Sequence, residues 1–184
     1  MYGYPDILSI LLKNNANPNI QGRGGWTALM WASRKGDIET VQALLAKGAE
    51  LDLKTTKFGW NALMVAAKNG QVEPLKLLIA KGKSVSAKDN EGDSVLSLAV
   101  LFQRPEIVRA LLEENAEVDP QRQDGSTPLI LACYKGYTEI VALLLAKNAD
   151  KDITNKAGFT ALRAAASHPE IVNLLESAGA GAKN

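Results

Sequence analysis

The sequence predicts an all-α fold, a solenoid of helix–turn–helix units with projecting loops between the units. Three observations support this prediction. A short pattern recurs along the 184 residues at a nearly constant spacing, two stretches of helical length follow each copy, and only Gly or Asn occurs after the second stretch. Self-similarity with a period between about 20 and 50 residues is typical of repeat architectures, in which each unit packs only against its neighbours.

A short polar residue precedes the first predicted helix of each unit. Successive copies are 34, 33, 33 and 33 residues apart, and they are Thr27, Asn61, Ser94, Thr127 and Thr160. The side chain of such a residue accepts a hydrogen bond from a backbone N–H of the first turn, so we expect each of them to be an N-cap. The extra residue of the first interval falls near residues 54–57, a polar stretch where a longer loop is tolerated.

The two predicted helices of a unit differ in the residues that they contribute to packing. The first helix carries a small residue that allows close helix approach, at Ala32, Ala66, Ala99, Ala132 and Ala165. The second helix carries a core leucine, at Leu11, Leu44, Leu78, Leu111, Leu144 and Leu175. Pro74 and Pro105 lie near the start of a second helix, where the missing N–H has no intrahelical partner.

Two turns complete each unit. The turn between the helices contains Gly36, Gly70 or Gly136, but Gln103 replaces glycine in the third full unit. The residue after the second helix is always Gly or Asn, at Asn15, Gly48, Gly82, Asn115, Asn148 and, after allowance for a two-residue deletion, Gly179. Because Gly and Asn adopt a left-handed backbone with least strain, the sequence predicts a left-handed residue at the end of every second helix.

The pattern resembles the ankyrin repeat, whose motif runs Thr-Pro-Leu-His-x-Ala, then Gly, then a leucine-rich second helix and Gly-Ala-Asp. Residues 127–132, with Gly136 and the closing residues 148–150, match this motif best, and the resemblance covers nearly the whole chain. The histidine of the motif is replaced by Met30, Met64, Ser97, Ile130 and Arg163. The resemblance implies a non-catalytic module that binds partners on its concave side, through loop tips and the exposed turns of the first helices.

The repeats predict a single domain over residues 1–184. It comprises a half repeat at 1–21, full repeats at 22–55, 56–88, 89–121 and 122–154, and a shortened C-terminal capping repeat at 155–184. In the last repeat Glu176 occupies a column that is otherwise Leu or Ile, and Arg163 replaces an uncharged residue. Polar side chains of this kind are typical of a capping repeat, whose outer face is exposed to solvent instead of packing against another repeat.

The first unit begins in its middle, because Gly3 aligns with Gly36 and only a second helix follows. We expect Leu8, Leu11 and Leu12 to be less buried than their equivalents in other repeats. One interpretation is a boundary within a longer ankyrin protein, and another is a native half-repeat cap. A monomer is expected, although the open edge offers a surface for self-association through the half repeat.

Composition restricts the possible functions. Hydrophobic residues make up 46% and charged residues 22% of the chain, and 21 basic against 20 acidic residues leave a formal charge of +1. No whole-chain field therefore attracts nucleic acid or an anionic membrane. The longest apolar run, residues 140–146, is too short to span a bilayer, and no secretory signal is recognised at residues 1–3, so we expect a cytoplasmic protein.

Residues that could perform chemistry are few. The chain has one cysteine, Cys133, and one histidine, His168, so the sequence predicts no internal disulfide, no Cys/His metal cluster and no cofactor. Cys133 is expected in the core and His168 in a surface turn. The glycine cluster at residues 22–25 lacks the Gly-Lys-Ser/Thr ending of a phosphate loop. Because no catalytic constellation can be assembled, the chain is not expected to be an enzyme.

The candidate binding residues occupy two columns of the repeat. The column before the N-cap holds Trp26, Trp60, Asp93, Ser126 and Phe159, where large rings either contact a partner or fold back over the next loop. The end of the first helix contributes Arg34, Lys35, Lys68, Leu101, Phe102, Tyr134 and Lys135. Leu101 and Phe102 are exposed in one interpretation and packed inward in the other, if Gln103 rebuilds the turn. All of these residues except Ser126 are predicted to bind protein.

The candidate surface combines basic and apolar side chains, which favours an acidic and partly apolar protein or peptide as the partner. Glu91, Asp93 and Asp124 add negative charge farther along, so a partner of mixed charge fits best. One alternative is a dedicated inhibitor or immunity-type protein that blocks a partner enzyme. The other is nucleic-acid binding through Arg23, Lys57 and the neighbouring cations, which the near-zero net charge makes the weaker interpretation.

Overall fold

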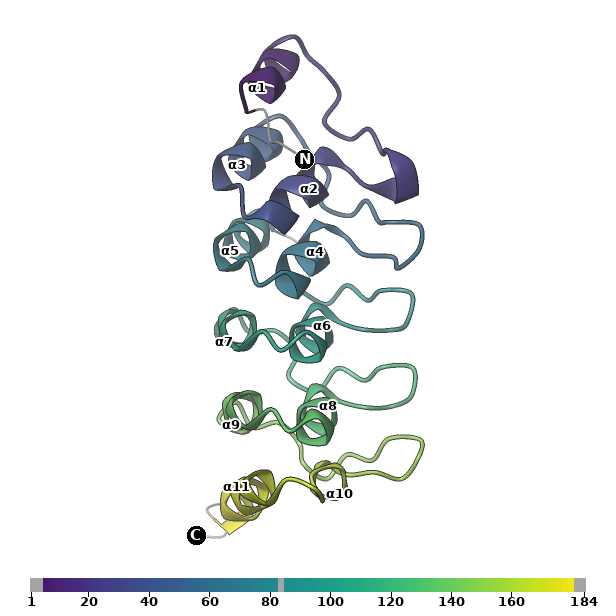
Figure 1. Cartoon of the computed structure of the whole chain (residues 1–184), viewed down its shortest axis with the longest axis vertical. Helices are drawn as coiled ribbons and strands as arrows, with labels where there is room; N and C mark the ends of the chain where they lie inside the picture. The colour runs from purple at the N-terminus through teal and green to yellow at the C-terminus, as the bar shows by residue number, and fades with distance from the viewer. Residues whose placement is uncertain (1–4, 83–84, 181–184) are drawn as a thin grey trace. The chain divides into compact units, whose positions relative to one another are not determined.

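The computed structural model describes residues 5–82 and 85–180. The chain divides into two compact units, residues 1–84 (unit 1) and 85–184 (unit 2), each of which is described by itself. The elements of unit 1 are α1 (Pro5–Lys13), the 3₁₀ turn η1 (Arg23–Gly25), α2 (Ala28–Lys35), α3 (Ile38–Ala46), α4 (Ala62–Lys68) and α5 (Val72–Ala80). Within this unit α2 packs against α4 and α3 against α5, while α1 packs against α3 (Figure 1).

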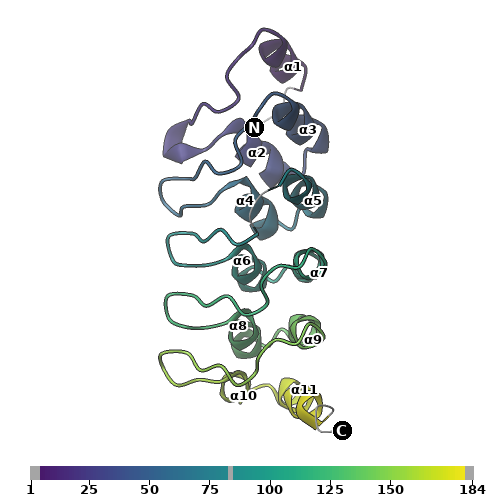
Figure 2. The same cartoon turned by 180° about the vertical axis from the view of Figure 1, so that it is seen from behind.

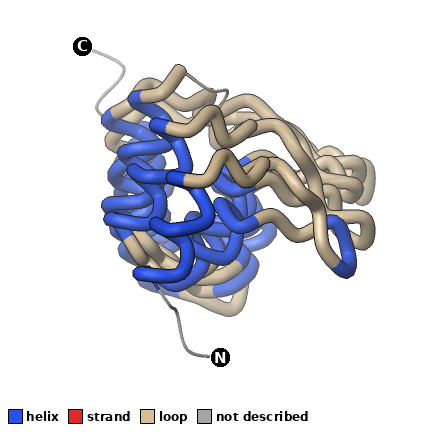
Figure 3. Tube along the Cα trace, turned by 90° about the horizontal axis from the view of Figure 1, so that it is seen from above, coloured by secondary structure: helices blue, strands red, loops and turns tan. Residues whose placement is uncertain are grey.

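Unit 2 repeats the same arrangement. Its helices are α6 (Val95–Leu101), α7 (Pro105–Glu113), α8 (Pro128–Lys135), α9 (Thr138–Leu145), α10 (Ala161–Ala164) and α11 (Pro169–Ala180). The first helices α6, α8 and α10 form one layer and the second helices α7, α9 and α11 form the other (Figure 2). In each unit the loops between repeats project to one side of the helices (Figure 3). The predicted helix–turn–helix organisation is therefore confirmed.

Each first helix begins at the predicted N-cap. The side chains of Thr27, Asn61, Ser94, Thr127 and Thr160 each accept a hydrogen bond from the backbone N–H three residues later. Such a bond satisfies one of the N–H groups that the first turn leaves without a partner, and removing it typically costs about 1 kcal/mol. One short polar side chain per repeat therefore fixes where the helix starts, and with it where the preceding loop ends.

The core follows the predicted columns. Alanines of the first helices and leucines of the second helices are buried, with Leu44, Leu111 and Leu144 fully inaccessible. The half repeat differs: Leu11 is 50% exposed and Leu8 is half-buried, as predicted, but Leu12 is only 5% exposed. The expectation for Leu12 is wrong because α1 still packs against α3 and covers this side chain. In the full repeats, the second helix also packs against the first helix of the same repeat, as α3 does against α2.

The backbone confirms the left-handed residue after the second helix in five repeats. The φ angles are 59° at Asn15, 79° at Gly48, 91° at Gly82, 56° at Asn115 and 59° at Asn148. The prediction is wrong at Gly179, because α11 continues through this residue to Ala180.

The turn between α6 and α7 keeps its geometry without glycine. Gln103 adopts a φ of 50°, in the same left-handed region as the 75° of Gly136. The turn is therefore not rebuilt, and Leu101 and Phe102 are both half-buried, between the two predicted extremes. Because a non-glycine residue with a positive φ is strained, this turn stores a small conformational cost.

Candidate functional site

Unit 1 carries a surface of aromatic rings and cations, beginning with the repeat that contains α2. Trp26 precedes the N-cap and Trp31 lies on the helix, with ring centroids 4.5 Å apart and planes inclined by 34°. The guanidinium carbon of Arg34 stands 5.3 Å from the Trp31 centroid and 5.9 Å from the Trp26 centroid. Arg34 lies about one helical turn after Trp31, so its guanidinium stands near both indole rings. The electron-rich faces of the rings attract this cation.

The next repeat of unit 1 contributes a second cluster of the same kind. Phe58 stacks on Trp60 with centroids 4.4 Å apart and an interplanar angle of 15°. Lys68 Nζ lies 4.1 Å from the Trp60 centroid, and Lys57 Nζ lies 4.9 Å from that of Phe58. Trp60 is only 7% exposed, because Phe58 and Lys68 cover its ring, and this burial agrees with the interpretation in which the ring folds back onto the protein. Phe58, at 38%, is the exposed ring of this pair.

The two clusters are adjacent. Their loops are joined by a hydrogen bond of 3.0 Å from the Thr56 N–H to the Gly24 carbonyl oxygen. A Cβ on Gly25, whose φ is 77°, would lie 2.8 Å from the Lys54 carbonyl oxygen, so the loops approach to backbone contact. Burial lowers the pKa of Lys68, and the nearby charge of Arg34 lowers it further. The helices that carry the two cations pack against each other, and the two charges are near enough to repel. We call the surface formed by Trp26, Trp31, Arg34, Lys57, Phe58, Trp60 and Lys68 the aromatic–cation surface.

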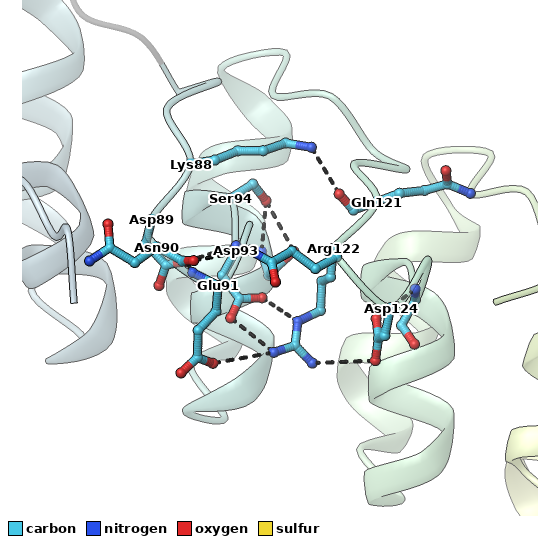
Figure 4. Close-up of polar contacts among 12 residues, drawn as sticks. Lys88, Asp89, Asn90, Glu91, Asp93, Ser94, Gln121, Arg122 and Asp124 are labelled. Atoms are coloured by element: carbon cyan, nitrogen blue, oxygen red, sulfur yellow. Dashed lines mark hydrogen bonds and ion pairs between the residues drawn. The ribbon is translucent and has the colours of Figure 1, made fainter. Parts of the chain in front are cut away.

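Unit 2 contains a buried ion pair between successive loops (Figure 4). Asp93 is 2% exposed, and its two carboxylate oxygens accept hydrogen bonds from Arg122 Nε at 2.5 Å and from Nη2 at 3.1 Å. Arg122 also lies 3.7 Å from Glu91 and 3.9 Å from Asp124. Burial raises the pKa of Asp93, and the hydrogen bond and charge of Arg122 oppose this effect. The side chain of Asp93 is therefore used within the protein, in contact with the next loop.

Beside this ion pair, the first helices and loops of unit 2 line an open groove with a volume of about 400 Å³. Four of the predicted binding residues meet there: Leu101, Tyr134, Lys135 and Phe159. Ile130, Leu131 and Ala164, all buried, contribute to the apolar lining, and Arg122 and Asp124 lie on the loop side. Tyr134 is 66% exposed, so the lip of the groove presents a large ring to solvent.

The geometry of both units agrees with a comparison of the sequence with known families. A family model described as ankyrin repeats in three copies matches residues 1–55, 48–124 and 96–184. The chain belongs to the ankyrin-repeat family. Ankyrin repeats generally act as protein–protein interaction modules, and the class of function predicted from the sequence agrees with this. Among the described residues, no helix is long and apolar enough to cross a membrane.

Several residues of these ankyrin repeats escaped the sequence prediction. Trp31 and Phe58 lie outside the two columns considered, although Trp31 is 37% exposed. Arg122 was missed because its role depends on a partner 29 residues away in the preceding loop. Its column holds Asp89, Arg122 and Asn155 in successive repeats, and this change of charge was the available signal. Lys35 and Phe102 do not line the groove, so the structure separates them from the other candidates.

The ankyrin repeats place the two chemically reactive side chains in structural positions. Cys133 is buried in α8, and this burial raises the pKa of its thiol to about 12. A thiol with this pKa stays protonated and is a poor nucleophile at neutral pH. His168 lies over the turn glycine of the preceding repeat, since a Cβ on Gly136 would lie 2.6 Å from His168 Cε1. Its ring therefore fills a packing position in the turn.

Proposed function

We propose that this ankyrin-repeat protein binds a partner protein or peptide in the groove of unit 2, which accepts an apolar side chain next to an acidic one. The observation that carries this proposal is the convergence of Leu101, Tyr134, Lys135 and Phe159 around one open, largely apolar groove. Clefts of a few hundred Å³ with an apolar floor and a few polar groups at the rim are typical of binding sites. Tyrosine at such a rim buries much area for few frozen torsions.

The charges around the groove favour an acidic partner. Lys135 lies 6.0 Å from the Tyr134 ring centroid and, among the described residues, forms no ion pair. Arg163 stands 4.5 Å from the Phe159 ring centroid and likewise has no carboxylate partner there. Asp124, in contrast, already lies near Arg122. The side of the groove formed by Tyr134 and Phe159 therefore offers uncompensated positive charge, whereas on the loop side Arg122 is shared among Asp93, Glu91 and Asp124.

Selection of peptides from a displayed library tests this proposal and does not require the natural partner to be identified first. Enriched sequences should combine a Leu, Phe or Tyr with Asp or Glu close by, and Tyr134→Ala should weaken their binding by about tenfold, as expected for the loss of an interface anchor. Lys135→Glu should weaken binding at least as much. The matched control is Lys147→Glu, which makes the same charge change on an exposed residue after α9, outside the groove.

The outcomes separate the possibilities. Equal losses with Lys135→Glu and Lys147→Glu would show that only net charge matters and would refute the groove as the site. Enrichment of basic peptides would refute the charge argument. Once a natural partner is known, loss of an enzyme partner's activity at stoichiometric ratio would identify an inhibitor, and unchanged activity would identify a scaffold.

A further inference from the structure

We propose that the aromatic–cation surface of unit 1 is an anion-binding site that accepts the phosphoryl group of a phosphorylated side chain on a partner protein. The site is centred on Arg34, with Lys68 beside it and the rings of Trp26, Trp31 and Phe58 around it. It belongs to unit 1 and does not depend on the groove of unit 2, so either proposal can fail without the other.

The first argument is the unusual environment of Arg34. Its guanidinium stands over two indole rings, and among the described residues it has no carboxylate partner. Two other arginines differ: Arg122 binds Asp93, and Arg109 lies 3.7 Å from Glu106 and 3.6 Å from Glu139, while Arg163 stands over a single ring rather than two. Contact with the rings restricts the Arg34 side chain while leaving its N–H donors available. A restricted guanidinium loses less entropy when it binds an oxyanion in the bidentate manner.

The second argument is the count of charges. Lys68 is half-buried on the Trp60 ring and close enough to Arg34 for the two like charges to repel. An anion placed between them relieves this repulsion. A carboxylate carries one negative charge, whereas a phosphate monoester carries nearly two at neutral pH and has three acceptor oxygens. The pair of cations therefore favours a phosphoryl group over a carboxylate.

The third argument concerns the rest of the ligand. Trp31 and Phe58 are 37% and 38% exposed, so apolar ring surface borders the two cations. In a phosphorylated side chain, carbon atoms lie next to the phosphate oxygens. These carbon atoms can contact the exposed rings while the oxygens bind the cations. A phosphorylated residue within a peptide matches both parts of the surface, whereas inorganic phosphate matches only the cations.

Tryptophan fluorescence gives a direct readout, because the three tryptophans of the chain, Trp26, Trp31 and Trp60, all belong to this surface. The first probe is phenyl phosphate, and the control is phenyl sulfate, which has the same shape but a single negative charge. Phenyl phosphate should give a saturable change and bind about tenfold more tightly than phenyl sulfate at neutral pH, because only its second charge differs. Its affinity should fall below about pH 6, where the phosphate gains a proton, while that of phenyl sulfate stays constant.

Variants locate the site. Arg34→Gln should weaken phenyl phosphate binding by about tenfold or more, as expected when a charge-assisted hydrogen bond is lost. Arg109→Gln is the control for the same charge change, because Arg109 lies in unit 2, outside both proposed sites, and is already paired with Glu106 and Glu139. This control should leave the titration unchanged. Far-UV circular dichroism of each variant checks that the helices are retained.

A second titration distinguishes a protein ligand from a small phosphate ester. A tripeptide with a central phosphotyrosine should bind more tightly than phenyl phosphate, and its unphosphorylated form should not bind measurably. Equal affinity for the phosphopeptide and phenyl phosphate would contradict a protein source of the ligand. Equal binding of phenyl phosphate and phenyl sulfate, absence of a saturable change, or an unchanged titration with Arg34→Gln would each overturn the proposed site.

Discussion

Replacing Arg122 by asparagine should destabilise unit 2, and replacing Asp93 by serine in the same chain should restore most of the loss. The reason is that the following pair of loops carries a neutral version of this contact. Asn155 stands one repeat after Arg122 and Ser126 one repeat after Asp93, and Asn155 Nδ2 donates to Ser126 Oγ at 3.1 Å. The double variant therefore copies a pair that the protein already builds.

The magnitudes follow from burial. Arg122→Asn leaves the Asp93 carboxylate, 2% exposed, without its charged partner and without two hydrogen bonds. Breaking a buried ion pair in this way costs about 3 to 5 kcal/mol, and we expect about 3 kcal/mol because the Arg122 side chain is itself 18% exposed. Asp93→Ser alone should cost about 1 kcal/mol, since Arg122 is partly exposed to solvent and stays close to the carboxylates of Glu91 and Asp124. The double variant should lie within about 1 kcal/mol of the wild type.

Urea denaturation followed by far-UV circular dichroism measures these free energies of unfolding, and the double-mutant cycle isolates the interaction. The expected coupling energy is about 3 to 4 kcal/mol, the sum of the two single losses minus the small loss of the double variant. Strictly additive effects, with the double variant as unstable as the sum of the single ones, would refute the reasoning that the two loops are joined by an interchangeable pair.

Three further predictions concern single residues. Gln103→Gly should raise the free energy of unfolding by about 0.5 to 1 kcal/mol, because glycine adopts a φ of 50° without strain, and a lowered stability would contradict this explanation. Cys133 should resist alkylation at pH 8 in the folded protein and react only after denaturation, as thiol titration would show; rapid labelling of folded protein would contradict its burial. Burial and the charges of Asp150 and Glu117 raise the pKa of Asp119 despite an opposing hydrogen bond from the Asp150 N–H. Part of the wild-type stability is therefore lost as the pH rises through this raised pKa, and Asp119→Asn should be more stable than the wild type at pH 7 but not at about pH 4. An advantage that is independent of pH would exclude the carboxylate charge as its cause.

The parts of the fold that the sequence predicted are those with a local physical cause. Thr27 and Asn61 cap helices through their own side chains, and Asn115 adopts a left-handed backbone that few residues tolerate. Each of these requirements recurs in every repeat, so it becomes visible as a column. Leu12 is buried against α3 although its repeat is incomplete, and Gly179 differs from its column because α11 continues through it.

The site was less predictable because it depends on contacts between repeats. The burial of Trp60 depends on Phe58, which comes from the lengthened loop, and on Lys68, which lies one helix away. The burial of Asp93 depends on Arg122 in the next loop. Such pairs change from repeat to repeat, so they show in a column only as a change of residue type and not as a constant feature. The position of Tyr134 and Lys135 depends less on contacts between repeats, because both lie at the end of a single helix whose register the N-cap fixes.

Site-specific photo-crosslinking in cells tests most directly whether a partner protein occupies the groove of unit 2. A photoreactive phenylalanine derivative replaces Tyr134 at the rim of the groove or, as a control, the exposed Ala142 on the second-helix layer. We predict a discrete crosslinked protein from position 134 that disappears when Lys135→Glu is added, and none from position 142. Crosslinking from position 142 with none from position 134 would contradict the assignment of the binding surface.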